Sequence, residues 1–167
     1  MFAITNATEF FAKVKQDLAT LEDKIDDSGR AMNCILSAYH LHEWVWAHLL
    51  KPTTPIKLGN LMVKDKSSFV AWLETACPHF TLLQELTNGT KHCAPVHSTS
   101  KIAGYGMGPY GIGPWGASYL LIDLGENIQI PQRWVVASDM LHGVVTFWDD
   151  FFAQHGVPLN PAAASDV

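Results

Sequence analysis

Apolar side chains recur at helical spacing along most of the chain. In the first such segment, from Ala7 to Asp26, they fall on one stripe, as in a helix with one buried face. The stripe consists of Phe10, Phe11, Val14, Leu18, Leu21 and Ile25. Asn6 and Glu9 stand at the spacing of a capping box at its start. The pattern predicts an amphipathic helix over about residues 7–26.

A second and more apolar helix is predicted between the Asp27-Ser28-Gly29 turn and Pro52. Its apolar residues cover most of the circumference, which is typical of a helix at the centre of a bundle. They are Met32, Ile35, Leu36, Tyr39, Leu41, Trp46, Leu49 and Leu50. Residues 52–66 are rich in Pro, Thr, Gly and Lys and predict a loop.

Two shorter helices are expected after this loop. The first spans about Ser68 to Ala76. The second starts at Cys77-Pro78, because proline suits the first position of a helix. It reaches Asn88-Gly89, where it either ends or continues weakly through His92.

Residues 104–116 contain two copies of a Gly-x-Gly-Pro-aromatic-Gly unit. Each copy matches G-x-G-x-x-G formally, but the prolines and the strand-like run that follows do not fit a dinucleotide-binding turn. The composition predicts a flexible loop. Tyr105, Tyr110 and Trp115 either pack this loop onto the bundle or belong to a mobile lid.

The remaining residues alternate between strand-like and helical patterns. Ala117–Asp123 and Asn127–Ile130 predict a β-hairpin over 117–130. A last helix is expected from about Pro131 to His155, and the tail over 157–167 is expected to be disordered.

Taken together, these elements predict an all-α fold. It is an up-and-down bundle of four to five helices, with the Gly-rich loop and the small hairpin inserted before the last helix. One domain covers residues 1–156.

Composition agrees with a globular protein. The chain has 167 residues, of which 48% are hydrophobic and 16% charged, and no apolar run is long enough to span a bilayer. Cys34, Cys77 and Cys93 lack a C-x-x-C spacing and indicate reduced thiols, and Met1–Glu9 lacks a secretion signal. We therefore expect a cytoplasmic protein that does not bind membranes. The net charge of −5 argues against non-specific nucleic-acid binding.

A narrow polar line interrupts the apolar surface of the second helix. Asn33, Ser37, His40 and Trp44 share this line, with Glu43 and His48 on its flanks and His42 on the opposite side. One interpretation is a plain solvent-exposed stripe. The other is an internal site, in which Glu43 lies at i, i+3 from His40 and would raise its pKa.

Other helices offer partners for such a site. Asn88, Lys91 and His92 share a face of the fourth helix, although Lys91 is equally consistent with a solvated lysine at a helix end. Asp139 and His142 stand at i, i+3 in the last helix. A mononuclear site for a divalent transition metal would use His40, Glu43, His92, Asp139 and His142.

The helical pattern and the Asn88-x-x-x-His92 spacing resemble the HEPN superfamily, small all-α bundles that include metal-independent ribonucleases of toxin and defence systems. The family motif is R-x(4-6)-H, often with Asn after the Arg. The resemblance implies that His92 is the catalytic histidine, that Asn88 is the polar residue of the motif and that no cofactor is needed. The motif arginine is missing, since Glu85, Leu86 and Thr87 occupy its positions, and Lys91 would be a poor substitute.

The favoured hypothesis is therefore a degenerate HEPN-like module that acts on RNA or mediates interactions, with His40 and Glu43 beside the motif residues. The alternatives are a metal-dependent enzyme that uses the histidine and carboxylate set, and a purely structural or partner-binding protein. RNA, a protein partner and a second copy of the chain all stay open as partners. The sequence is also similar to uncharacterised bacterial and phage proteins, a likeness that implies no activity.

Overall fold

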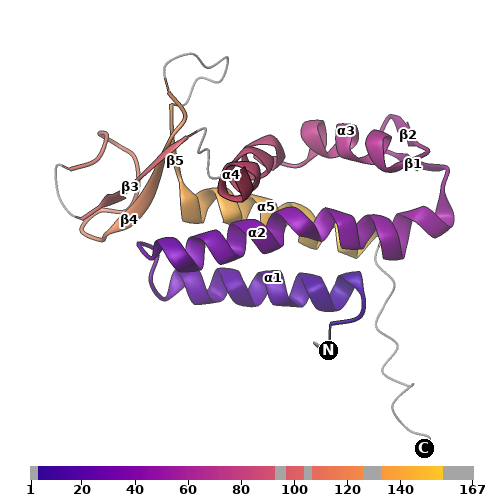
Figure 1. Ribbon diagram of the computed structural model, residues 1–167, viewed down its shortest axis with the longest axis horizontal. Coiled ribbons are helices and arrows are strands. Elements are labelled where there is room, and N and C mark those ends of the chain that lie inside the picture. Colours follow the sequence, from indigo (N-terminus) through magenta and orange to yellow (C-terminus); the bar gives the residue numbers. More distant parts are fainter. Residues whose placement is uncertain (1–3, 93–96, 104–106, 126–132, 156–167) are drawn as a thin grey trace, which may run out of the picture.

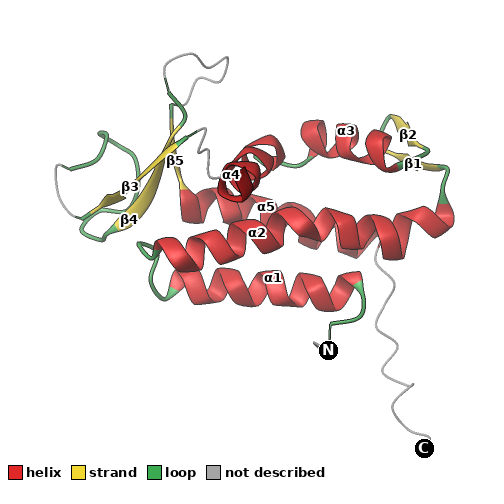
Figure 2. Cartoon of the chain, in the orientation of Figure 1, coloured by secondary structure: helices red, strands yellow, loops and turns green. Residues whose placement is uncertain are grey.

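The computed structural model describes residues 4–92, 97–103, 107–125 and 133–155, and of Lys91 and His92 it describes only the backbone. The described chain is mostly helical, with two small antiparallel sheets (Figure 2). None of its described helices has the length and apolar character needed to cross a membrane.

Helix α2 (Ser28–Val45) lies at the centre of the bundle, as its apolar surface predicts (Figure 1). Helix α1 (Ala7–Glu22) runs antiparallel to it, and α5 (Ala137–His155) packs against both. On the side of α2 away from α1, helix α4 (Phe80–His92) crosses it, and α3 (Lys66–Ala76) packs against α4. The five helices thus surround one core.

The helix starts follow from side-chain caps. The Asn6 side chain accepts a hydrogen bond from the Glu9 backbone N–H at 2.9 Å, which caps α1. The Glu9 carboxylate in turn accepts from the backbone N–H of Thr5 at 2.6 Å, one residue before the cap. The Asp27 side chain caps the first turn of α2 in the same way.

The strands form two separate sheets. β1 (Ile56–Leu58) pairs with β2 (Leu61–Val63) in a hairpin between α2 and α3. The second sheet has the order β3–β4–β5, with β3 (Ser98–Ile102), β4 (Tyr119–Asp123) and β5 (Trp134–Val136) all antiparallel. Strands β4 and β5 contact α5, which joins this sheet to the bundle.

The first strand of the predicted hairpin over 117–130 is present as β4. Both edges of β4 are occupied, by β3 and β5, and Asn127–Ile130 lies outside the described residues. The predicted helix start near Pro131 is wrong: α5 begins at Ala137, because the β-branched pair before it lies in β5. The predicted loop over 52–66 is also wrong in part, since it contains β1 and β2.

Three helix ends differ from the prediction. α1 ends at Glu22, because the chain must reach the extended conformation of Asp27 that caps α2. After α2 the chain continues through a π-helical turn over Trp46–Leu50 and a short 3-10 turn. α4 begins only at Phe80, because His79 has a φ of 59° and breaks the helix after Pro78.

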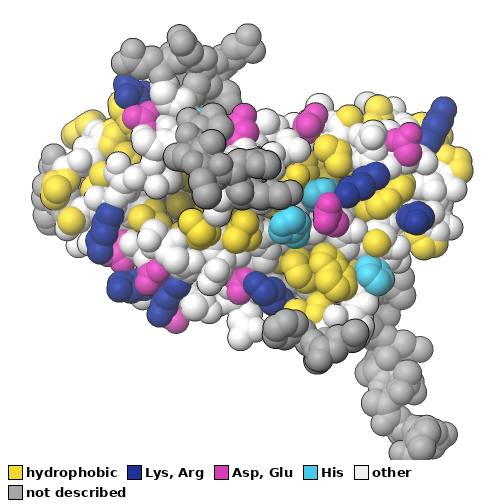
Figure 3. Space-filling view, in the orientation of Figure 1, with side chains coloured by type: hydrophobic (Ala, Val, Ile, Leu, Met, Phe, Trp, Pro, Cys, Tyr) yellow, Lys and Arg dark blue, Asp and Glu magenta, His cyan; other side chains and the backbone are white. Residues whose placement is uncertain are grey.

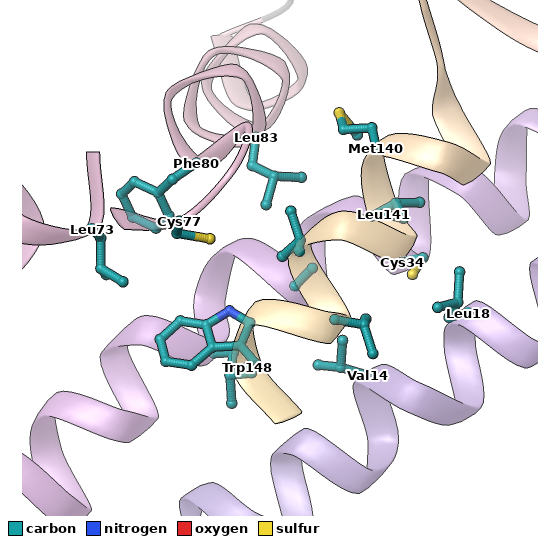
Figure 4. Close-up of a cluster of buried hydrophobic side chains, with 14 of the residues drawn as sticks. Val14, Leu18, Cys34, Leu73, Cys77, Phe80, Leu83, Met140, Leu141 and Trp148 are labelled. Atoms are coloured by element: carbon teal, nitrogen blue, oxygen red, sulfur yellow. The ribbon is translucent and has the colours of Figure 1, made fainter. Parts of the chain in front are cut away.

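Trp148 of α5 lies at the middle of the core and is fully buried (Figure 4). Figure 4 shows Phe80 and Leu83 of α4 on one side of it and Val14 of α1 on the other. Such contacts between residues distant in the sequence hold α4 and α1 on opposite faces of the bundle. They supply the hydrophobic stabilisation of the fold.

The described part of the Gly-rich segment is a pair of turns over Tyr119. The Tyr119 hydroxyl donates to the Ile112 carbonyl at 2.8 Å, and the ring is buried. Two of the three aromatics suggested to pack this segment onto the bundle are not buried, since Tyr110 is 100% and Trp115 82% exposed. Tyr105 lies outside the described residues.

Two alanine substitutions in this segment distinguish the stability cost of a steric clash from the cost of backbone strain alone. Gly113 and Gly111 have φ values of 82° and 76°, but a Cβ at Gly113 would lie 2.4 Å from Cζ of Tyr119, whereas no described atom lies within 4 Å of one at Gly111. We expect Gly111→Ala to lower the free energy of unfolding by about 1 to 2 kcal/mol, the cost of the left-handed conformation. Gly113→Ala should lower it clearly more. Urea unfolding measures both, and equal losses would show that the turn does not rest on Tyr119.

Candidate functional site

The polar line on α2 packs mainly against α1. The Ser37 hydroxyl donates to the Asp17 carboxylate of α1 at 2.5 Å, and the Trp44 ring stacks on Phe10 of α1 with 4.9 Å between centroids. His48 stacks in turn on Trp44. This line is therefore part of the α1–α2 contact, and Ser37 and Trp44 do not line an internal site.

His40 and Glu43 lie at the surface. Their closest nitrogen and oxygen are 3.7 Å apart, and each side chain is 49% exposed. Lys66 of α3 donates to the same carboxylate at 2.8 Å and holds α3 against α2. Figure 3 shows histidine, acidic and basic side chains gathered here, beside α3. Of the two interpretations of this pair, the solvent-exposed stripe is correct and the internal site is wrong, because neither side chain is removed from water.

His42 is the buried histidine of α2. It is 3% exposed, its Nδ1 lies 2.5 Å from the Tyr39 carbonyl, and its ring packs edge-on against Phe80. Burial lowers its pKa below the usual value of a histidine, so the neutral ring is favoured. The apolar side on which the sequence places His42 is thus the side that faces α4.

The described residues do not bring the predicted metal ligands together. His142 pairs with Glu22 of α1 at 2.8 Å, and Asp139 is exposed. No three described His, Cys, Asp or Glu side chains are arranged to hold a metal ion. The His92 side chain lies outside the described residues, so its distance from His40 stays untested.

The HEPN-motif residues are only partly placed. Asn88 is exposed on α4, and the backbones of Lys91 and His92 lie in its last turn. The side chains of Lys91 and His92 lie outside the described part of the chain, so the distances between the motif side chains stay untested.

The described thiols are unsuited to nucleophilic catalysis. Cys34 and Cys77 are free and buried. Burial raises the pKa of each thiol to about 12, so almost no thiolate forms at neutral pH. Cys93 lies outside the described residues.

A cavity of about 350 Å³ lies between the N-terminal half of α2, the second half of α4 and the β3–β4–β5 sheet. This volume falls within the range of small-molecule sites. Most of its lining is apolar and comes from four elements: Ala31, Met32, Ile35, Leu86, Leu120 and Ile122, with Ala137 of α5. Ser28, Thr90 and Thr99 add hydroxyl groups.

One ionisable pair lines this cavity. His97, directly before β3, and Glu85 of α4 are joined by a bond of 2.7 Å between Nε2 and Oε2. The His97 side chain is 12% exposed and that of Glu85 42%. His97 is not evident from the sequence, because the chain changes from helix to strand between Glu85 and His97 and no periodicity connects them.

The arrangement of an apolar cavity with one polar pair at its wall is typical of a site that binds a small molecule. No protein-family model, curated protein or solved structure matches the chain. The function is therefore inferred from the geometry of the cavity and its polar pair.

The Glu43–Lys66 pair is expected to make a small contribution to the free energy of unfolding, and this contribution depends on pH. The hydrogen bond from Lys66 is the main cause of a lowered Glu43 pKa, so the stabilisation is present above the unfolded value near 4.3 and is lost as pH falls through the folded value. Glu43→Gln should cost less than about 1 kcal/mol at neutral pH and nothing at about pH 3, because the pair is exposed.

Urea unfolding at both pH values tests this, with Glu74→Gln on α3 as a control that should change little at either. A loss above about 2 kcal/mol would indicate a buried functional pair instead.

The burial of His42 predicts that the stability of the protein also depends on pH in the range where histidine titrates. Its folded pKa lies below the unfolded value near 6.5, so the unfolded chain binds more protons below that pH and stability is lost as pH falls. The decline between about pH 7.5 and pH 5 should be shallower in His42→Leu than in the parent protein. His48→Gln, at an exposed site, should leave the decline unchanged. Parallel pH profiles for His42→Leu and the parent would contradict the neutral state of His42.

Proposed function

We propose that this protein is a binding module for a small ligand with a mainly apolar body. The ligand occupies the cavity between α2, α4 and the β3–β4–β5 sheet. The observation that carries this proposal is the cavity itself, which is large enough for such a ligand and is lined by aliphatic side chains from α2, α4 and β4.

The hydrophobic effect favours an apolar occupant. Water in a cavity lined mainly by aliphatic side chains finds fewer hydrogen-bond partners than it has in bulk solvent. Replacing that water by an apolar ligand releases it to bulk and buries aliphatic surface on both sides. The side chain of Met32, 45% exposed, stands where the cavity meets solvent and can adapt to different shapes.

The RNA-directed activity that the HEPN resemblance implies stays a prediction. The charges beside the α2 polar line do not favour it, because Lys66 of α3 is paired with the Glu43 carboxylate of α2. Ligand binding in the cavity requires no residue of the motif, and the two hypotheses can be tested separately.

A fluorescent probe tests the proposal. N-phenyl-1-naphthylamine is neutral and apolar, and its emission rises in apolar surroundings. At about 0.3 kcal/mol per heavy atom it should bind with a Kd on the order of 0.1 mM, with a saturable rise in emission. Met32→Trp places a bulky ring at the cavity mouth and should weaken binding about tenfold or more.

Met62→Trp is the matched control, because Met62 is 48% exposed on β2 and does not line the cavity. It should bind the probe as the parent does. Absence of saturable binding to the folded parent, or equal binding by both variants, would contradict the proposal. Circular dichroism checks that all three proteins are folded.

A further inference from the structure

The charges around the cavity indicate which polar group its ligand carries. Glu85 is bound to His97 through Oε2 alone, and its Oε1 atom accepts no hydrogen bond from any described residue. The bond to His97 fixes the carboxylate on the cavity wall. A fixed acceptor at the edge of an apolar cavity is a group that a ligand can use to orient itself.

The other polar groups of the cavity wall provide few hydrogen-bond donors for an anionic ligand. Ser28 brings the N-terminus of α2 to the cavity, and such an end normally favours negative charge. Here two of its free N–H groups are already taken, because Oδ1 of Asp27 accepts from Gly29 at 3.0 Å and from Arg30 at 3.1 Å. These bonds lower the pKa of Asp27, which stays ionised, and Lys24 and Arg30, each 3.9 Å from its carboxylate, balance its charge.

The neighbouring cations are directed elsewhere. Arg30 donates to the Thr20 carbonyl of α1 at 2.6 Å. Lys24 lies 3.9 Å from the Asp27 carboxylate.

From these contacts we propose that the ligand of the cavity carries a protonated amino group, which binds Oε1 of Glu85 while the apolar body fills the space between α2 and β4. This inference rests on the proposed function. A hydroxyl group could form the same hydrogen bond but without the charge, and a carboxylate would be repelled by Glu85.

Three probes with one apolar body separate these head groups: cyclohexylmethylamine, cyclohexylmethanol and cyclohexanecarboxylate. Isothermal titration calorimetry with the full chain gives each affinity, and displacement of N-phenyl-1-naphthylamine shows that the probe occupies the cavity. The amine should bind about tenfold tighter than the alcohol, because a charge-assisted hydrogen bond is stronger than a neutral one, and the carboxylate should bind weakest.

Glu85→Gln keeps the shape of the side chain and removes its charge. In this variant the amine should bind no more than about threefold tighter than the alcohol, while the alcohol affinity is unchanged. Glu74→Gln, on the exposed side of α3, should keep the full amine preference. Added salt should reduce the preference in the parent protein, since the partly exposed Glu85 is screened.

The outcomes distinguish the two proposals. Equal affinities of amine and alcohol in the parent, or an amine preference that survives Glu85→Gln, would overturn the amine assignment and leave cavity binding intact. If neither the naphthyl probe nor any cyclohexyl probe binds in the cavity, both proposals are wrong. The comparison of probes on the parent protein needs no variant, so a folding defect in Glu85→Gln would not prevent a decision.

Discussion

The burial of α2 is the constraint on which the rest of the structure depends. This helix is apolar over most of its circumference, so it is stable only when other elements cover it on several sides. α1 and α5 cover one side along much of its length, and α4 crosses the other near Tyr39 and His42. Because α4 crosses α2 (Figure 1), it cannot cover the first turns. At this end of α2, Ala31 and Met32 line the cavity together with residues of α4 and of the β3–β4–β5 sheet.

The helices could be predicted from the sequence because their signals are local. Asn6 and Asp27 cap helices within three residues, and the apolar stripe of α1 repeats at helical spacing. The sheets gave no such signal. β3 exposes Ser98 to Lys101, so it has no apolar face, and β5 consists of Trp134–Val136, which is too short to show a period. These strands are defined by their partner β4, which is distant in sequence.

The two ionisable pairs also differ in how far the sequence predicts them, because one lies within a single helix and the other joins two elements. His40 and Glu43 form a pair that the sequence predicts correctly in spacing, but burial is set by α3 and the solvent, which spacing cannot show. Glu85 and His97 belong to different elements and meet only when β3 joins the sheet. A pair within one helix is therefore found by pattern, whereas the pair at the cavity depends on the tertiary fold. The pair at the cavity is nevertheless the one beside a space that a ligand can occupy.

The central claim is that an apolar space between α2, α4 and the sheet is open to a ligand. The most direct test is a crystal structure of the protein under xenon pressure, because xenon enters apolar cavities without any specific chemistry. The account predicts a strong anomalous peak between Ile35 of α2 and Ile122 of β4, where the cavity lining is aliphatic. A cavity filled by the protein's own side chains, with no xenon between these two residues, would contradict it.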